Sequence, residues 1–155
     1  QMDEKFDELL GAKIVPVSDS IIPLEWVANS PGHIQRLVHQ INGCYDFSFY
    51  DACAALCRRL MESLIIQVYL INRRREEIQG NGSFIGLDAL IRKICNDNEI
   101  IVGRNTNRTM IKIKGIGDTA AHDRSYITPQ IDVDDVKAEY RRVVNELLTL
   151  CQMRN

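Results

Sequence analysis

The sequence lacks an excess of either charge: 19 Lys and Arg residues stand against 21 Asp and Glu residues, for a net charge of −2 at pH 7. This balance gives the whole protein no attraction to nucleic acid or anionic membranes, so such binding must come from a local patch. The longest hydrophobic run, LMESLIIQVYLI at residues 60–71, contains Glu62 and is shorter than the ~20 residues that cross a bilayer. The acidic start QMDEKFDELL lacks the basic beginning and apolar centre of a signal peptide. We therefore expect a soluble, cytoplasmic protein with no membrane partner.

A C-x-x-C pair is also absent. The five cysteines form an odd set, which argues against a disulfide framework and against a zinc ribbon. Cys53 and Cys57 share a helix face, so a metal-binding pair is an alternative, but small apolar core residues in a reducing compartment are the preferred interpretation. We expect no metal and no cofactor.

With 45% hydrophobic and 26% charged residues, the composition is typical of one globular domain. The stretch GAKIVPVSDSIIPLEWVANSPG carries three prolines, which prevent a long helix and predict an irregular arm packed onto the body through Trp26 and its isoleucines. We divide the chain into an acidic start and proline-bearing arm at residues 1–32 and a helical bundle at residues 33–155.

Apolar residues recur every three or four positions over most of the bundle, which predicts an all-α fold. The first expected helix carries Ile34, Leu37, Val38 and Ile41 and ends near Asn42, and the second runs from about Phe47 to Asn72. Ser83 is expected to cap a helix that buries Phe84, Leu87, Ile91 and Ile94. Asp132 is expected to cap a last helix whose inner face runs from Val133 to Cys151.

The stretch KGIGDTAAHD at residues 114–123 has two interpretations. GIGDTA fits the G-x-G-x-x-[G/A] pattern of a dinucleotide-binding turn, but that fold needs a long helix and a second strand after the turn. Only eleven residues separate Gly117 from Pro129, and the rest of the chain is predicted to be helical. We therefore favour a helix that starts near Asn105 or Thr106.

On such a helix Ile113, Ile116, Gly117, Ala120 and Ala121 share one face, and its small members allow a neighbouring helix to come close. Lys114, Asp118 and His122 follow one another at intervals of four on an adjoining face, and Arg104, Arg108 and Lys112 form a basic stripe before them. For His122 taken alone, interaction with the helix dipole is the simpler interpretation.

Two motifs resemble the HEPN superfamily, and in particular a bacterial branch of unknown function associated with restriction and defence proteins. Cys57, Arg58, Arg59 and Glu62 match its C-R-R-x-x-E-like core, and Lys114, Gly117, Ala120, Ala121 and His122 match its later motif. The resemblance covers about residues 34–151. It implies an up-and-down helical bundle that forms a homodimer through the face carrying the histidine.

Active members of this superfamily are metal-independent endoribonucleases with an R-[N/D/H]-x-x-x-H motif, so the resemblance implies His122, Lys114 and Asp118 as catalytic candidates. His122 would exchange a proton and Lys114 would contact phosphate. The candidates for nucleic-acid binding are Arg58, Arg59, Arg104, Arg108, Lys112 and Arg124. Gly117 stands where the motif arginine belongs, so enzymatic activity stays open, and Arg58 has an alternative partner in Glu62 at i+4.

Two functions follow. The first is binding of RNA or a nucleotide, with or without weak cleavage, in a defence or toxin-type context. The second is a non-catalytic assembly domain of a larger defence or restriction protein, in which the glycine and alanines make a helix contact and Asp118 and His122 complete a polar network.

Overall fold

The computed structural model describes residues 15–154, and the acidic start expected at residues 1–10 lies outside them. The chain is an all-α helical bundle, as predicted. Its longer helices are α2 (Gly32–Asp46), α3 (Tyr50–Ile71), α5 (Thr106–His122) and α7 (Lys137–Leu150). Shorter elements are α4 (Leu87–Cys95), α6 (Gln130–Asp134), the 3-10 turns Leu24–Val27 and Arg75–Ile78, and the paired strands β1 (Gln79–Gly80) and β2 (Ser83–Phe84). Within residues 15–154, none of the helices combines the length and apolar character needed to cross a bilayer.

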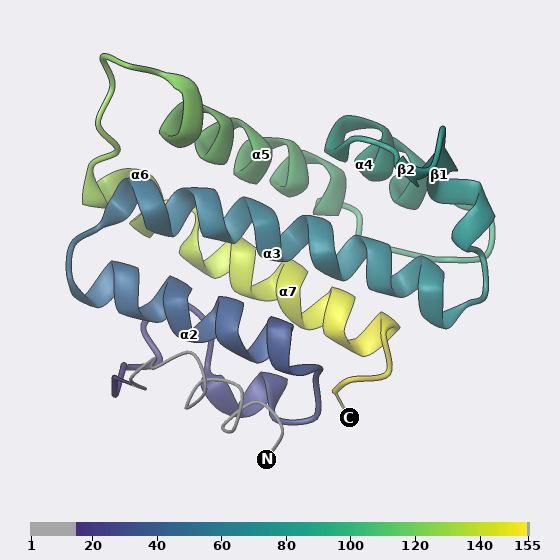
Figure 1. Cartoon of the computed structure of the whole chain (residues 1–155), viewed down its shortest axis with the longest axis horizontal. Helices are drawn as coiled ribbons and strands as arrows, with labels where there is room; N and C mark the ends of the chain where they lie inside the picture. Colours follow the sequence, from purple (N-terminus) through teal and green to yellow (C-terminus); the bar gives the residue numbers. More distant parts are fainter. Residues whose placement is uncertain (1–14, 155) are drawn as a thin grey trace.

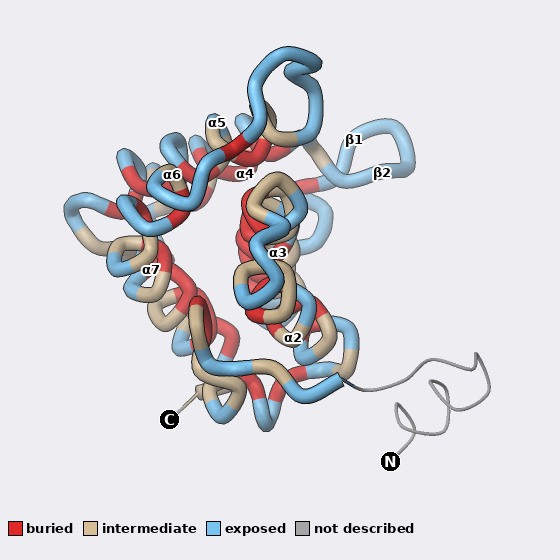
Figure 2. The backbone as a smooth tube through the Cα atoms, turned by 90° about the vertical axis from the view of Figure 1, so that its left-hand side faces the viewer, coloured by how far each residue is buried: buried red, intermediate tan, exposed pale blue. Residues whose placement is uncertain are grey.

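Helix α3 runs through the middle of the bundle, with α5 on one side and α2 on the other (Figure 1). The end-on view shows the buried sides of α3, α5 and α7 facing a common interior (Figure 2). Buried residues occupy more than one face of α3, because its apolar positions are dense and no glycine or proline interrupts them. Because α3 is central, Arg58 lies beside α5, and Arg59 is exposed on the surface of the bundle.

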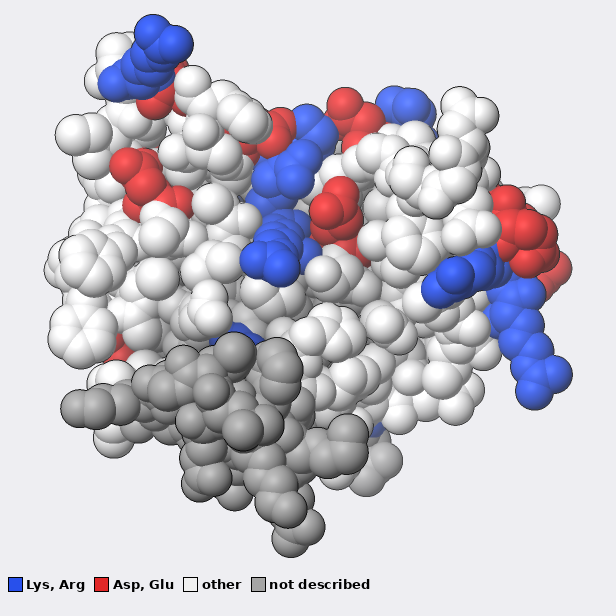
Figure 3. All heavy atoms as spheres, viewed as in Figure 1, with Lys and Arg blue, Asp and Glu red and all other residues white. Residues whose placement is uncertain are grey.

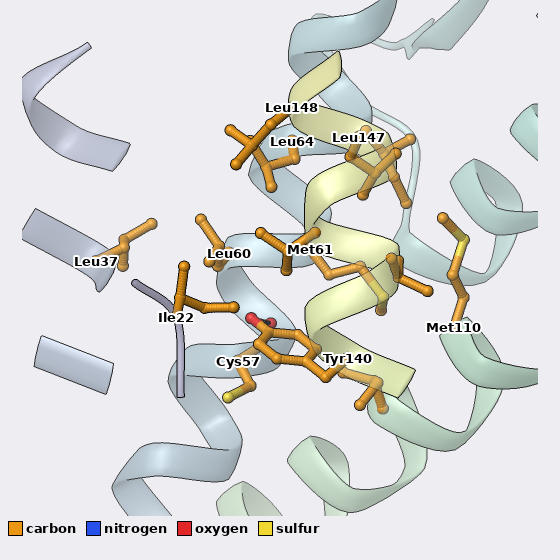
Figure 4. Packing of buried hydrophobic residues seen from close by; sticks show 14 of the residues in the cluster. Ile22, Leu37, Cys57, Leu60, Met61, Leu64, Met110, Tyr140, Leu147 and Leu148 are labelled. Atoms are coloured by element: carbon orange, nitrogen blue, oxygen red, sulfur yellow. Dashed lines mark hydrogen bonds between the residues drawn. The ribbon is translucent and has the colours of Figure 1, made fainter. Parts of the chain in front are cut away.

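The core lies between α3 and α7. Leu60, Met61 and Leu64 of α3 lie beside Leu147 and Leu148 of α7, and the labelled side chains of α2, α5 and the arm surround them (Figure 4). Tyr140 is only 1% exposed, and its hydroxyl donates to the Cys57 carbonyl oxygen at 2.8 Å. This bond satisfies the one polar atom that the Tyr140 side chain brings into the core.

The five cysteines are free, as expected, and three of them are buried. Burial raises the pKa of the Cys151 thiol to about 12. A thiol with so high a pKa stays protonated at neutral pH and is a poor nucleophile or metal ligand.

From residue 15 onward, the proline-bearing arm packs onto the body, as expected. Ile21 and Ile22 are buried, and Trp26 packs partly buried against the core. Asn42, itself fully buried, accepts the backbone N–H groups of Ile21 and Ile22 at 3.0 Å each and donates to the Ile22 carbonyl at 2.8 Å. Arg141 of α7 donates to the Ile21 carbonyl at 2.5 Å. The side chains of Asn42 and Arg141 therefore satisfy backbone groups of the arm that have no hydrogen-bond partner within a helix or strand.

The expected helix cap at Ser83 is wrong. Ser83 and Phe84 form β2, which pairs with β1 across a turn at Asn81 and Gly82, both with positive φ. Phe84 is 36% exposed, and α4 starts only at Leu87. The reason is local: Asn-Gly is the preferred dipeptide of a two-residue hairpin turn, because both central residues need positive φ.

The expected cap at Asp132 is also wrong, although the inner face of the last helix is confirmed. Asp132 lies inside α6, which follows Pro129, and the chain turns before α7 begins at Lys137. Val133 and Val136 are buried on either side of this break, so the apolar periodicity continues across it. The two other boundaries also shift: α2 continues to Asp46, and α3 begins at Tyr50 rather than at Phe47.

Candidate functional site

The stretch KGIGDTAAHD is helical up to His122, since α5 runs from Thr106 to that residue. This confirms the helix interpretation and excludes the dinucleotide turn. Asn105 occupies the N-cap position without a side-chain hydrogen bond. Instead, the carboxylate of Glu146 on α7 accepts the Gly103 N–H at 3.1 Å and the Thr106 hydroxyl at 2.9 Å, which fixes the start of α5 against α7.

Gly117 lies where α5 meets α3. A Cβ atom placed on Gly117 would stand 2.5 Å from the Cβ of Arg58 and 2.9 Å from its Cδ, distances that no pair of non-bonded carbon atoms tolerates. Ile113 is buried on the same face, but Ala121 is exposed, so the predicted inner face ends before it. The close approach of the two helices therefore depends on glycine at position 117.

Asp118, the next residue, belongs to a group of four charged side chains from three helices. Its Oδ1 lies 2.7 Å from Nε of Arg58 on α3, and its Oδ2 accepts from Nζ of Lys114 one turn earlier. The Lys114 ammonium also lies 3.5 Å from Oδ1 of Asp88 on α4. We call Arg58, Asp88, Lys114 and Asp118 the ion-pair cluster. Arg58 thus pairs with Asp118 and not with Glu62.

Within the ion-pair cluster, each cation lies beside a carboxylate. The hydrogen bond with Asp118 raises the pKa of Lys114. Burial alone would raise the pKa of Asp118, but the hydrogen bond from Lys114 and the charge of Arg58 outweigh it and lower that pKa. Lys114 and Asp118 are therefore both ionised at neutral pH. Lys114 and Arg58 could contact a phosphate only by weakening these pairs.

His122 takes no part in this cluster. It is the last residue of α5 and is exposed, one turn beyond Asp118. Within residues 15–154 its side chain makes no hydrogen bond or ion pair. Arg59 and Arg124 are exposed as well and lie outside the cluster. The structure thus brings Arg58, Lys114 and Asp118 together and leaves His122, Arg59 and Arg124 facing solvent.

A second group of candidates follows the outer side of α5. Arg104, Arg108 and Lys112 are exposed and spaced four residues apart, so they line one side of the helix and the turn before it. Of the three, only Lys112 has a carboxylate within ion-pair distance in the described part of the chain, Glu139 at 3.8 Å. We call these three residues the basic ridge.

An open hollow of about 400 Å³ adjoins the basic ridge. Lys112, Thr119, Tyr126 and Asp132 are among its lining residues, together with Gly115, whose missing side chain leaves open space. The Tyr126 ring is 42% exposed, and its hydroxyl donates to Asp132. The hollow therefore presents an ammonium group, a carboxylate, hydroxyls and an aromatic ring side by side.

On the face shown in Figure 3, basic and acidic side chains alternate along the seam between α3 and α5, and most of the remaining surface is uncharged. No family model, curated protein or solved structure matches this chain. The resemblance to the HEPN superfamily therefore stays a prediction, and only the geometry of the site bears on function.

Sequence reasoning missed three parts of this region. Asp88 was not recognised as a partner of Lys114, because the two lie on different helices. Tyr126 and Asp132 were not expected to flank a hollow, although Tyr126 is an aromatic residue in a loop rich in turn-forming residues, and such loops often carry function. Spacing identifies neighbours on one helix, such as Lys114 and Asp118, but not contacts between helices.

Proposed function

We propose that this chain is a helical domain that binds single-stranded RNA along the outer side of α5. The observation that carries the proposal is the basic ridge: three exposed cations at regular spacing, with one acidic neighbour among the described residues, in a protein whose net charge is negative. Contacts of Lys and Arg with phosphates supply most of the sequence-independent affinity of nucleic-acid-binding proteins. A local ridge is what such binding requires when the net charge gives no attraction.

The hollow beside the basic ridge favours single-stranded over double-stranded RNA as the ligand. Single strands expose bases that stack on aromatic side chains, whereas the bases of a duplex are already stacked. Tyr126 presents a partly exposed ring next to Lys112, so one nucleotide has both a stacking surface and a phosphate contact within reach.

Cleavage is a separate part of the proposal, and it depends on His122. Lys114 and Asp118 are held in the ion-pair cluster, and Gly117 brings no side chain to the place of the motif arginine. His122 is exposed at the end of the helix that carries the basic ridge, where it can exchange a proton with bound RNA. Any ribonuclease activity of this chain is therefore expected to be weak, independent of metal and abolished in His122→Ala.

The experiment is a binding titration of a fluorescent oligouridine RNA, followed by anisotropy in the presence of a chelator. The triple variant Arg104→Gln/Arg108→Gln/Lys112→Gln is expected to bind at least about tenfold more weakly than wild type, since each lost phosphate contact weakens binding. The matched control, Arg73→Gln/Arg75→Gln/Arg92→Gln, removes the same charge from exposed positions elsewhere and should bind nearly as well as wild type.

If RNA binding is equally weakened in both triple variants, the effect comes from the change in net charge, and the role of the basic ridge is refuted. Absence of salt-dependent RNA binding by wild type would overturn the proposal as a whole. Gel analysis of the same mixtures separates binding from cleavage: products with wild type but not with His122→Ala indicate a ribonuclease, and intact RNA indicates a binding domain.

A second candidate is an assembly domain that forms a homodimer through α5. Ala121 is small and exposed near the end of this helix. Small side chains of this kind allow another helix to come close. Sedimentation velocity tests this candidate: a dimer that dissociates in Ala121→Arg supports it, and a monomer at all concentrations contradicts it.

A further inference from the structure

One end of the bundle combines exposed apolar side chains from three segments. Phe47 and Phe49, in the turn between α2 and α3, are 60% and 63% exposed and stack on each other at a centroid distance of 6.5 Å. Ile127 and Ile131, in the loop before α6 and in α6, are 80% and 57% exposed. We call these four residues the apolar end.

These segments are held together by hydrogen bonds. The Thr128 N–H donates to Asp51 Oδ1 at 2.9 Å, which ties the loop to the start of α3. Gln130 of α6 donates to the Tyr45 hydroxyl at 3.1 Å, and that hydroxyl donates to Asp134 at 2.5 Å. Figure 1 shows the α2–α3 turn, α6 and the loop before it at the same end of the molecule. The segments that carry the four apolar side chains are therefore joined to one another.

The segments that carry the apolar end are rich in aspartate. Segments 44–51 and 122–137 contain six aspartates, namely Asp46, Asp51, Asp123, Asp132, Asp134 and Asp135, against two basic residues, Arg124 and Lys137. We call the six aspartates the acidic rim. In the described part of the chain none of them lies within ion-pair distance of a Lys or Arg. This contrasts with the other side of the bundle, where Asp88, Asp97 and Asp118 all face cations.

Neutral donors hold much of the acidic rim in place. Ser18 donates to Asp46 through its N–H and its hydroxyl, and Ser125 does the same for Asp123. These bonds lower the pKa of Asp46 and of Asp123, so both carboxylates are ionised at neutral pH. Asp46 and Asp123 therefore keep their negative charge, and among the described residues no Lys or Arg lies within ion-pair distance of either.

We propose that the apolar end, together with the acidic rim, is a docking surface for a basic amphipathic segment of a partner protein. Four large apolar side chains exposed together at one place are unusual for a surface without a partner. The stacked phenylalanines supply aromatic anchors, and lysines or arginines of the segment meet the uncompensated carboxylates. The inference goes beyond RNA binding and does not depend on it.

The negative charge of the acidic rim also argues against other occupants of the apolar end. Anionic lipid headgroups would be repelled by six carboxylates. A second copy of this chain, related by a two-fold axis, would place one acidic rim against another and so bring like charges together. A cationic segment with an apolar face satisfies both components of the surface.

The test uses the complete chain and a fluorescent synthetic peptide of about 14 residues, with leucine and lysine at helical spacing, as the probe. Wild type and the control Ile101→Ser, which removes an equally exposed apolar side chain elsewhere, are expected to bind it with equal affinity. Phe47→Ser/Phe49→Ser should bind at least about tenfold more weakly, since both changes remove buried contact area from the complex. The same peptide with glutamate in place of lysine should not bind.

Three results would overturn the proposal: no binding of the lysine peptide, unchanged binding by Phe47→Ser/Phe49→Ser, or equal binding of the glutamate peptide. Sedimentation velocity on the same proteins tests whether a second copy of the chain occupies the surface. If wild type self-associates and only Phe47→Ser/Phe49→Ser abolishes this, the surface is a dimer interface. Circular dichroism checks that the variant, altered only at exposed positions, keeps its helical content.

Discussion

Replacing Gly117 by alanine places a methyl group 2.5 Å from the Cβ of Arg58. The Cβ of Arg58 cannot rotate away, because it is attached directly to the backbone of α3. To restore an ordinary carbon–carbon contact, α5 and α3 have to separate by about 1 Å. Overpacking of this kind costs about 3 kcal/mol at the upper end of its usual range, and the better helix propensity of alanine returns about 1 kcal/mol. We therefore expect Gly117→Ala to lower the free energy of unfolding by about 2 kcal/mol.

Gly115→Ala is the matched control on the same helix. Nothing lies within 4 Å of a Cβ at this position, so only the propensity gain remains and the free energy of unfolding should rise by about 1 kcal/mol. Urea unfolding followed by circular dichroism measures both values, with the slope against urea expected to be the same in all variants. A Gly117→Ala protein as stable as Gly115→Ala would refute the claim that glycine sets the distance between α5 and α3.

A double-mutant cycle locates the collision. Arg58→Gly removes the atom that the new methyl group would strike, so Gly117→Ala should cost less in that background than in wild type, even though Arg58→Gly itself weakens α3. An unchanged cost would place the strain elsewhere on α5.

The remaining predictions concern stability. The side chain of Asp97 is 1% exposed and receives two hydrogen bonds from Arg74, so Asp97→Asn should lower the free energy of unfolding by about 3 kcal/mol in urea at pH 7. Arg74 lowers the pKa of Asp97, and Arg74 followed by Lys93 lowers that of Glu77 to about 2. Both carboxylates therefore stabilise the fold above about pH 4, and this stabilisation is lost as the pH falls below that value. The loss of stability at low pH should be smaller in Asp97→Asn than in wild type. Identical profiles of stability against pH for the two proteins would contradict the argument. Asn42→Ala leaves buried backbone groups of Ile22 without partners and should lower stability by about 2 kcal/mol, with faster hydrogen exchange in the arm as the independent readout.

The helices were predictable where apolar residues repeat without interruption. The spacing in α3 and the run from Ile113 to Gly117 in α5 determine which side faces the core, whatever the rest of the chain does. The errors at Ser83 and Asp132 have a common cause: a residue type that can cap a helix does not by itself start one. At Ser83 the preceding Asn-Gly turn outweighs that preference and pairs two strands instead.

The candidate site was predictable only in part, because spacing reports contacts within one helix. Lys114 and Asp118 were expected on one face, and they form an ion pair. Their partners Arg58 and Asp88 come from α3 and α4, and only the packing of three helices brings these charges together. For the same reason the sequence suggested Lys114 as a phosphate contact, whereas in the folded protein it pairs with Asp118 and Asp88.

The salt dependence of RNA binding tests the central claim, that the basic ridge contacts phosphates, most directly. Three contacts with a single strand correspond to a slope of about −2 for the logarithm of the association constant against the logarithm of salt concentration. We expect this slope for wild type and for Arg73→Gln/Arg75→Gln/Arg92→Gln, and a slope near zero for Arg104→Gln/Arg108→Gln/Lys112→Gln. An unchanged slope after removal of the ridge would show that Arg104, Arg108 and Lys112 do not contact the RNA backbone.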